Sequence, residues 1–149
     1  MLFCEKTTIS QIFRLLKFHK MNKINSLVTI YGISNCDTVK KARAWLTTHG
    51  LEHQFHDFKK EGVSAERLAT WCSAAGLDKV LNRKGTTWRG LTPTQQESAG
   101  QLEHALALMQ ANTSLIKRPI VEWGSETEAQ LTVGFSPETW MKHIQPGAK

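Results

Sequence analysis

The sequence predicts an α/β fold with a mixed sheet of about four strands. Three features indicate it: a strand–helix–strand unit near the start, a helical middle, and two strands and a helix at the end. A chain of 149 residues with 40% hydrophobic residues can bury one sizeable core. We therefore expect one domain over residues 27–144, with an N-terminal extension at 1–26 and a tail at 145–149.

The first unit is a strand, a helix and a second strand. Residues 27–31 are a short β-branched run typical of a buried strand, and Gly32 ends it. Apolar residues at helical spacing then predict a helix over residues 37–49, and residues 53–58 indicate the second strand. This βαβ arrangement forces a parallel pair, with the loop before the helix at the carboxyl edge of the sheet, where α/β sites usually lie.

The middle of the chain is expected to be helical. Ser64 caps a segment with Cys72 on its apolar face, and residues 102–109 mark another helix. Between them, residues 82–90 are expected to form a polar loop that holds Arg83.

The end of the chain returns to strand. Residues 115–116 are expected to be extended, the chain breaks at Pro119, and strands follow at 120–123 and near 130–133. Because proline cannot donate to a central ladder, a cis turn at Pro119 would resolve the conflict. Ser136 then caps a last helix. The order βαβ, helices, ββα is a thioredoxin-like plan with an inserted helical region.

Composition excludes several classes of protein. Three widely spaced cysteines fit neither a disulfide scaffold nor a zinc site, and the six histidines are scattered, so no metal is expected. Half of the +6 formal charge lies in the first twenty residues, which leaves a mildly basic domain and no indication of nucleic acid binding. No run approaches the roughly 18 apolar residues of a membrane span, and no secretion signal is present, so we expect a soluble cytoplasmic protein without membrane contact.

Residues 1–26 form a separate basic segment. Apolar residues between Ile9 and Phe18 could make an amphipathic helix that contacts a membrane or a partner. We favour the other interpretation, an upstream start or a loosely ordered extension, because Met21 lies just before the first strand and the domain does not need the segment.

Cys36 is the main candidate for chemistry because it directly precedes a helix. The helix dipole and unpaired backbone N–H groups there favour thiolate over thiol, and Lys40 adds positive charge one turn on. The alternative is an inert core cysteine, which is the interpretation we favour for Cys72. Val39 stands three residues after Cys36, where a resolving cysteine could lie. A disulfide made by Cys36 must therefore be resolved by another molecule, naturally a small external thiol.

Two arginines lie in segments that could converge on this thiol. Arg118 directly precedes Pro119, and Arg83 lies in the polar middle loop. An arginine fork suits an arsenate-like ion, glutathione or an acidic peptide. Each could instead be a solvated surface charge.

Five short motifs follow one another along residues 27–144. They are 31–42 (YGISNCDTVKKA), 55–62 (FHDFKKEG), 82–83 (NR), 116–120 (IKRPI) and 133–135 (VGF). This series resembles the arsenate reductase ArsC/Spx family, and within it the YffB-like branch. The resemblance implies a thioredoxin-like domain with a helical insertion.

The resemblance also implies roles for individual residues. Cys36 would be the catalytic thiolate, Pro119 would be cis, and Arg83 and Arg118 would match two of three arginines that hold an anion. No bound cofactor is implied, and glutathione would be the co-substrate. The residues expected to bind substrate or glutathione are Asn35, Lys40, Arg83, Arg118 and Pro119.

The function we expect is that of an oxidoreductase, a glutathione-dependent thiol–disulfide reductase with Cys36 as its single reactive thiolate. Phe135 stands where the family carries its third arginine, which disfavours arsenate as substrate. The first alternative is an arsenate reductase that uses glutathione and glutaredoxin. The second is a non-catalytic, Spx-like regulator that binds RNA polymerase, although Val39 removes the C-x-x-C switch often found in such regulators.

Overall fold

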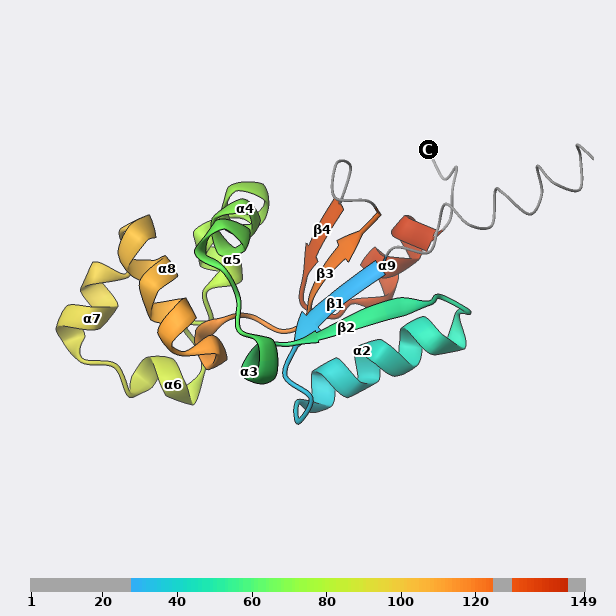
Figure 1. Ribbon diagram of the computed structural model, residues 1–149, viewed down its shortest axis with the longest axis horizontal. Coiled ribbons are helices and arrows are strands. Elements are labelled where there is room, and N and C mark those ends of the chain that lie inside the picture. Colours follow the sequence, from blue (N-terminus) through green and yellow to red (C-terminus); the bar gives the residue numbers. More distant parts are fainter. Residues whose placement is uncertain (1–27, 125–129, 145–149) are drawn as a thin grey trace, which may run out of the picture.

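The computed structural model describes residues 28–124 and 130–144. One mixed sheet has the strand order β2-β1-β3-β4, with β1 and β2 parallel and the pairs β1–β3 and β3–β4 antiparallel (Figure 1). The strands are β1 (Val28–Gly32), β2 (His53–Asp57), β3 (Ile120–Trp123) and β4 (Gln130–Val133). The fold is therefore the mixed α/β sheet that the sequence predicts.

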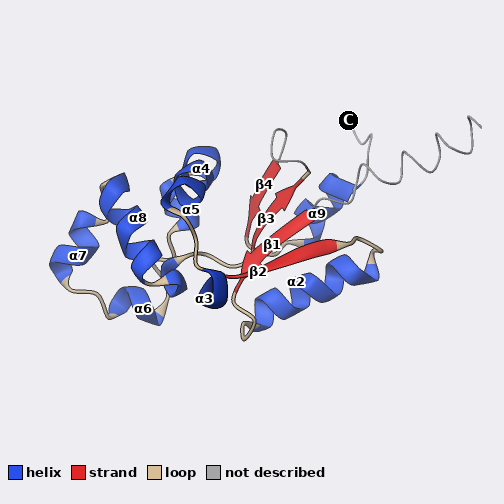
Figure 2. Ribbon diagram, in the orientation of Figure 1, coloured by secondary structure: helices blue, strands red, loops and turns tan. Residues whose placement is uncertain are grey.

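Helices lie on both faces of this sheet. Figure 2 shows α4 to α8 grouped together beside the sheet, apart from α2 and α9. We call residues 65–115 the helical insertion. The helices are α2 (Asp37–Thr48), α3 (Phe58–Glu61), α4 (Ala65–Ala75), α5 (Leu77–Val80), α6 (Thr86–Arg89), α7 (Pro93–Ser98), α8 (Leu102–Ala111), the 3₁₀ turn η1 (Thr113–Leu115) and α9 (Pro137–Ile144).

Alternation along β1 divides the core in two. Ile30 faces one side, where it packs with Leu46 of α2 and Trp140 of α9. Tyr31 faces the other side, where it joins the core of the helical insertion, including Trp71 of α4. Because side chains alternate along a strand, a single buried strand supports both layers. None of the helices in the described residues is both long and apolar enough to cross a membrane.

The βαβ unit forms as predicted, with small differences at its ends. The first helix runs from Asp37 to Thr48, one residue short of the expected range. The second strand ends at Asp57 rather than at Phe58, because the Asp57 side chain accepts a hydrogen bond from the Lys59 N–H (2.9 Å) and begins α3 there.

Two expectations for the middle of the chain are wrong. Residues 115–116 do not form a strand: the Asn112 side chain accepts a hydrogen bond from the Ser114 N–H (3.1 Å) and starts a 3₁₀ turn. Ile116 then makes only an isolated bridge with Leu81. Residues 82–90 are not entirely loop, because Thr86–Arg89 forms the short helix α6.

The last part of the fold agrees with the sequence. The Arg118–Pro119 peptide bond is cis and directly precedes β3. Ser136 caps α9, since its Oγ accepts from the Thr139 N–H (3.4 Å). The predictions for residues 1–26 and 145–149 fall outside the described residues.

Candidate active site around Cys36

Cys36 occupies the N-cap position of α2, at the end of the loop that follows β1. Its backbone is extended (φ −105°, ψ 123°), its N–H donates to the Ile33 carbonyl (3.1 Å), and its carbonyl accepts from the Lys40 N–H (3.0 Å). The half-buried side chain makes no capping hydrogen bond, so the sulfur is not used to close the helix end. The first-turn N–H groups and the helix dipole therefore favour negative charge where the sulfur lies.

Asp57 secures the loop that carries this cysteine. Its side chain is buried at the end of β2 and accepts hydrogen bonds from Ser34, in the Cys36 loop, and from the Lys59 N–H. Burial raises the pKa of Asp57, but the hydrogen bonds from Ser34 and Lys59 outweigh it and hold the pKa below its ordinary value. An ionised carboxylate thus links the end of β2 to the reactive loop.

A cavity of about 370 Å³ opens beside Cys36. It lies between the carboxyl edge of the sheet and the helical insertion, and two of its lining side chains, Lys59 and Arg118, are cationic. None of the lining residues carries a carboxylate, so the cavity favours an anionic ligand next to the thiol. The lining residues are Ile33, Asn35, Cys36, Lys59, Asn82, Gly85, Thr86, Thr87, Ser114 and Arg118.

The structure brings some of the predicted site residues together and leaves others apart. Asn35, Cys36 and Arg118 line the same cavity. Lys40 is exposed on the first turn of α2 and does not line it. Pro119 is buried behind the cis bond, and its carbonyl accepts from the Gly134 N–H (2.8 Å).

Arg83 points toward other residues of the helical insertion rather than into the cavity. Its guanidinium carbon lies 4.9 Å from the centre of the Trp88 ring, and its Nη2 lies 3.3 Å from Oδ1 of Asp78. The Arg83 Nε is buried without a hydrogen-bond partner among the described residues. In this conformation Arg83 stacks on the Trp88 ring and does not line the cavity.

Sequence reasoning did not select several residues that line the cavity. Lys59 lies in α3, two residues after the end of β2 at the carboxyl edge, and a position just after a strand is the same signal that singled out the Cys36 loop. Thr86, Thr87 and Ser114 come from the helical insertion, where no local pattern marks them. The site therefore combines one edge of the sheet with hydroxyl groups brought by tertiary packing.

Cys72 lies in the core, as expected. It is buried on α4, and burial raises the pKa of its thiol, which keeps it protonated and unreactive. Within residues 28–124 and 130–144, no group of three His, Cys, Asp or Glu side chains lies close enough together to hold a metal ion. Of the two described cysteines, Cys36 is therefore the one suited to chemistry.

A comparison of the sequence with known protein families agrees with the structure, which has a thioredoxin-like sheet, a cysteine at a helix start and a cis Pro119. The profile of the ArsC family matches residues 31–143. The chain belongs to the ArsC family. A protein of Haemophilus influenzae without an assigned function is 41% identical to this ArsC chain over 95 residues, which is 64% of this chain and 82% of that protein.

Solved structures agree with the ArsC assignment. The structure of the YffB protein is 40% identical, superposes with a TM-score of 0.72, and covers 79% of this chain and 99% of that one. An arsenate reductase (ArsC) related protein of Brucella melitensis is 42% identical, with a TM-score of 0.61, and covers 79% and 94% of the two chains.

Phe135 lies between β4 and α9. Its ring meets that of Trp140 edge-on, with centroids 4.9 Å apart and planes at 76°. Phe135 thus packs against the core between the sheet and α9, and it contributes no charge to an anion site.

Proposed function

We propose that this ArsC-family protein is a glutathione-dependent thiol–disulfide reductase in which the Cys36 thiolate is the nucleophile. The observation that carries the proposal is the cavity in which Cys36 lies with Lys59 and Arg118 and without a lining carboxylate. Glutathione presents a sulfur and two carboxylates, so its charges complement those of the cavity. Cys36 lies at the N-cap of α2, where the first-turn N–H groups and the helix dipole can stabilise negative charge on the attacking sulfur.

In the first step the Cys36 thiolate attacks the glutathione sulfur of a mixed disulfide between glutathione and a substrate thiol. The substrate–glutathione S–S bond breaks, and a new S–S bond joins Cys36 to glutathione. The substrate sulfur leaves with the electron pair and takes a proton from water, so the substrate is reduced to its thiol. Lys59 and Arg118 would bind the glutathione carboxylates and align its sulfur with Cys36.

In the second step a further glutathione thiolate attacks the glutathione sulfur bound to Cys36. This breaks the bond to Cys36, restores the thiolate and releases glutathione disulfide. Val39 occupies the position of a resolving cysteine, and the other thiol among the described residues, that of Cys72, is buried in the insertion core, so we assign this second step to an external thiol. In the sum of the two steps, one glutathione thiol is oxidised and one substrate sulfur is reduced, and the products are the substrate thiol and glutathione disulfide.

The test measures both the adduct and the turnover. In a Cys4→Ala background, which removes the third cysteine of the sequence, the Cys36→Ser variant should form no glutathione adduct by intact mass and should not release thiol from a glutathionylated peptide. The Cys72→Ala variant is the matched control and should keep both properties, because it removes the other described thiol. Adduct formation and turnover that survive in Cys36→Ser would refute the proposal.

Arsenate reduction is the second candidate function, favoured by ArsC family membership and by the cationic cavity. The packing of Phe135 against Trp140 counts against it, because the charge of a third arginine is missing. An assay with arsenate, glutathione and glutaredoxin compares the two. Arsenate turnover faster than release of thiol from the glutathionylated peptide would make arsenate the preferred substrate.

A further inference from the structure

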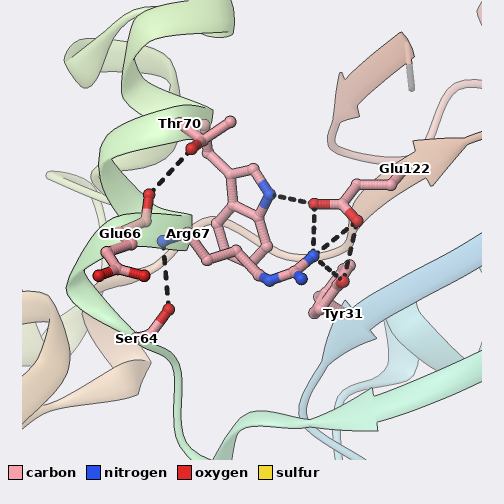
Figure 3. Close-up of polar contacts among 7 residues, drawn as sticks. Tyr31, Ser64, Glu66, Arg67, Thr70 and Glu122 are labelled. Carbon is pink, nitrogen blue, oxygen red and sulfur yellow. Dashed lines mark hydrogen bonds and ion pairs between the residues drawn. The ribbon is translucent and has the colours of Figure 1, made fainter. Parts of the chain in front are cut away.

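Glu122 on β3 accepts hydrogen bonds from three side chains at once (Figure 3). Its Oε2 accepts from the Tyr31 hydroxyl (2.9 Å) and from Nη1 of Arg67 (2.8 Å). Its Oε1 accepts from Nε1 of Trp71 (2.7 Å) and again from Nη1 of Arg67 (3.0 Å). We call these four residues the Glu122 cluster.

The Glu122 cluster joins the sheet to the helical insertion. Tyr31 and Glu122 belong to β1 and β3, whereas Arg67 and Trp71 belong to α4. Tyr31 and Trp71 are 4% and 1% exposed, and their rings meet with centroids 4.8 Å apart. The side chains of Glu122 and Arg67 are 19% and 37% exposed. Because the rings of Tyr31 and Trp71 are buried, leaving the Trp71 donor without its acceptor would be costly, and these bonds favour one position of the insertion on the sheet.

The same two strands carry residues of the Cys36 cavity at their ends. Tyr31 pairs with Ile120 across the antiparallel β1–β3 ladder. Cys36 lies in the loop that follows β1, and Arg118 lies just before β3, so both reach the same edge of the sheet. The Glu122 cluster therefore spans the two strands whose ends carry these cavity residues.

The opposite wall of the cavity comes from the helical insertion. Asn82, Thr86 and Ser114 line it and face the wall that carries Cys36 and Arg118. The separation of the two walls thus depends on how the insertion is seated on the sheet. The binding of a ligand that contacts both walls depends on this separation. The reaction rate of a small reagent that needs only the Cys36 sulfur does not.

We propose that Glu122 is a positioning residue that fixes the helical insertion over Cys36 and so sets the fit of a glutathione-sized ligand in the cavity. The inference rests on the proposed function, because it requires that the glutathione ligand of the Cys36 site contacts both walls of the cavity. Glu122 does not line the cavity and acts through Tyr31, Arg67 and Trp71.

The test uses the Glu122→Gln variant of the full chain. Glutamine keeps the size of the side chain but replaces one acceptor oxygen by an amide donor, which cannot serve the donors of Arg67 or Trp71. We expect the KM for a glutathionylated peptide to rise about tenfold while kcat stays within about twofold of the wild-type value. The reaction of Cys36 with glutathione disulfide should slow by a similar factor, while its alkylation by iodoacetamide should not change.

The matched control is Thr132→Val. It removes the buried hydrogen bond that Trp123 Nε1 donates to Thr132 Oγ1 (2.9 Å), on the α9 side of the sheet. This variant should lose stability without any change in KM or in the two Cys36 rates. If Glu122→Gln does not fold, Trp71→Phe, which removes one of the donors, replaces it with the same expected shifts.

The outcomes separate this inference from the proposed function. If wild-type protein releases no thiol from the glutathionylated peptide, the proposed function fails. The positioning role is then judged from the two Cys36 rates alone, which need no turnover. Equal slowing of both rates, or a lower melting temperature with neither rate changed, would overturn the role of Glu122.

Discussion

Val39 of α2 packs directly against the backbone of Gly32 at the end of β1. A Cβ atom placed on Gly32 would lie 2.7 Å from Cγ2 of Val39, and Val39 is fully buried. The close approach holds the start of α2, and hence Cys36, against the strand end. The residue at the position of a resolving cysteine is thus part of the packing that places the reactive one.

The Val39→Cys variant should convert Cys36 from a residue that needs an external thiol into half of an internal pair. Cysteine is small enough for the site, and the two thiols would lie three residues apart at a helix start. The lost methyl volume should cost about 1 kcal/mol of unfolding free energy. After treatment with glutathione disulfide, intact mass should show oxidised protein without a retained glutathione, whereas wild type keeps one.

Val39→Ala is the control for this experiment because it removes volume without adding a thiol. It should be at least as destabilised as Val39→Cys and should retain one glutathione per chain. Retention of glutathione by Val39→Cys to the same extent as by Val39→Ala would contradict the prediction.

The difference between what the sequence predicts and what it misses follows from the range of the interactions. The βαβ unit, the cis Pro119 and Cys36 at a helix start depend on local patterns that are visible in the sequence. In the sequence, Glu122 is a single polar residue within an apolar strand. Its role cannot be recognised there because its partner Arg67 lies 55 positions away. The expected strand at 115–116 is wrong because a short apolar pair fits a buried turn equally well.

Arg83, which the sequence singled out as a site residue, and Lys59, which it did not, illustrate the same limit. Arg83 and Lys59 both lie in polar segments near the ends of elements. Which of the two faces the cavity is decided by tertiary packing, since Trp88 offers Arg83 a ring to stack on. Which cation faces the cavity depends on how the insertion is placed on the sheet, and no local sequence pattern encodes that placement.

Lys59 should contribute to binding of glutathione, and its neighbour Lys60 provides a matched control. Both are exposed cations of α3, but only Lys59 lines the cavity. Loss of one ion-paired carboxylate contact in Lys59→Gln should raise the KM for glutathione by about fivefold to tenfold. Lys60→Gln should leave it unchanged. Steady-state kinetics at two ionic strengths would check this, and equal effects of the two substitutions would argue against a specific contact.

Arg118 and Arg83 should differ in the same assay. Arg118 lines the cavity, so Arg118→Gln should raise the KM for glutathione about tenfold. Arg83 is held by Asp78 and Trp88, so Arg83→Gln should change the KM by less than about twofold. A larger effect of Arg83→Gln would mean that this side chain leaves Trp88 and reaches the ligand.

Asp57 should make the stability of the protein depend on pH in the acid range. Its pKa in the folded protein lies below the ordinary value, so its contribution is fully present above the unfolded-state pKa of about 3.9 and is lost as pH falls through the folded value. Asp57→Asn should therefore lower the unfolding free energy by about 1–2 kcal/mol at pH 7, and its difference from wild type should shrink as the pH falls below about 3.9. Asp78→Asn, at a carboxylate whose side chain is 88% exposed, is the control and should show a small, nearly pH-independent difference. Urea unfolding followed by tryptophan fluorescence at pH 7, 5 and 3 measures both variants, and a constant difference for Asp57→Asn across this range would show that the charge of Asp57 does not stabilise the Cys36 loop.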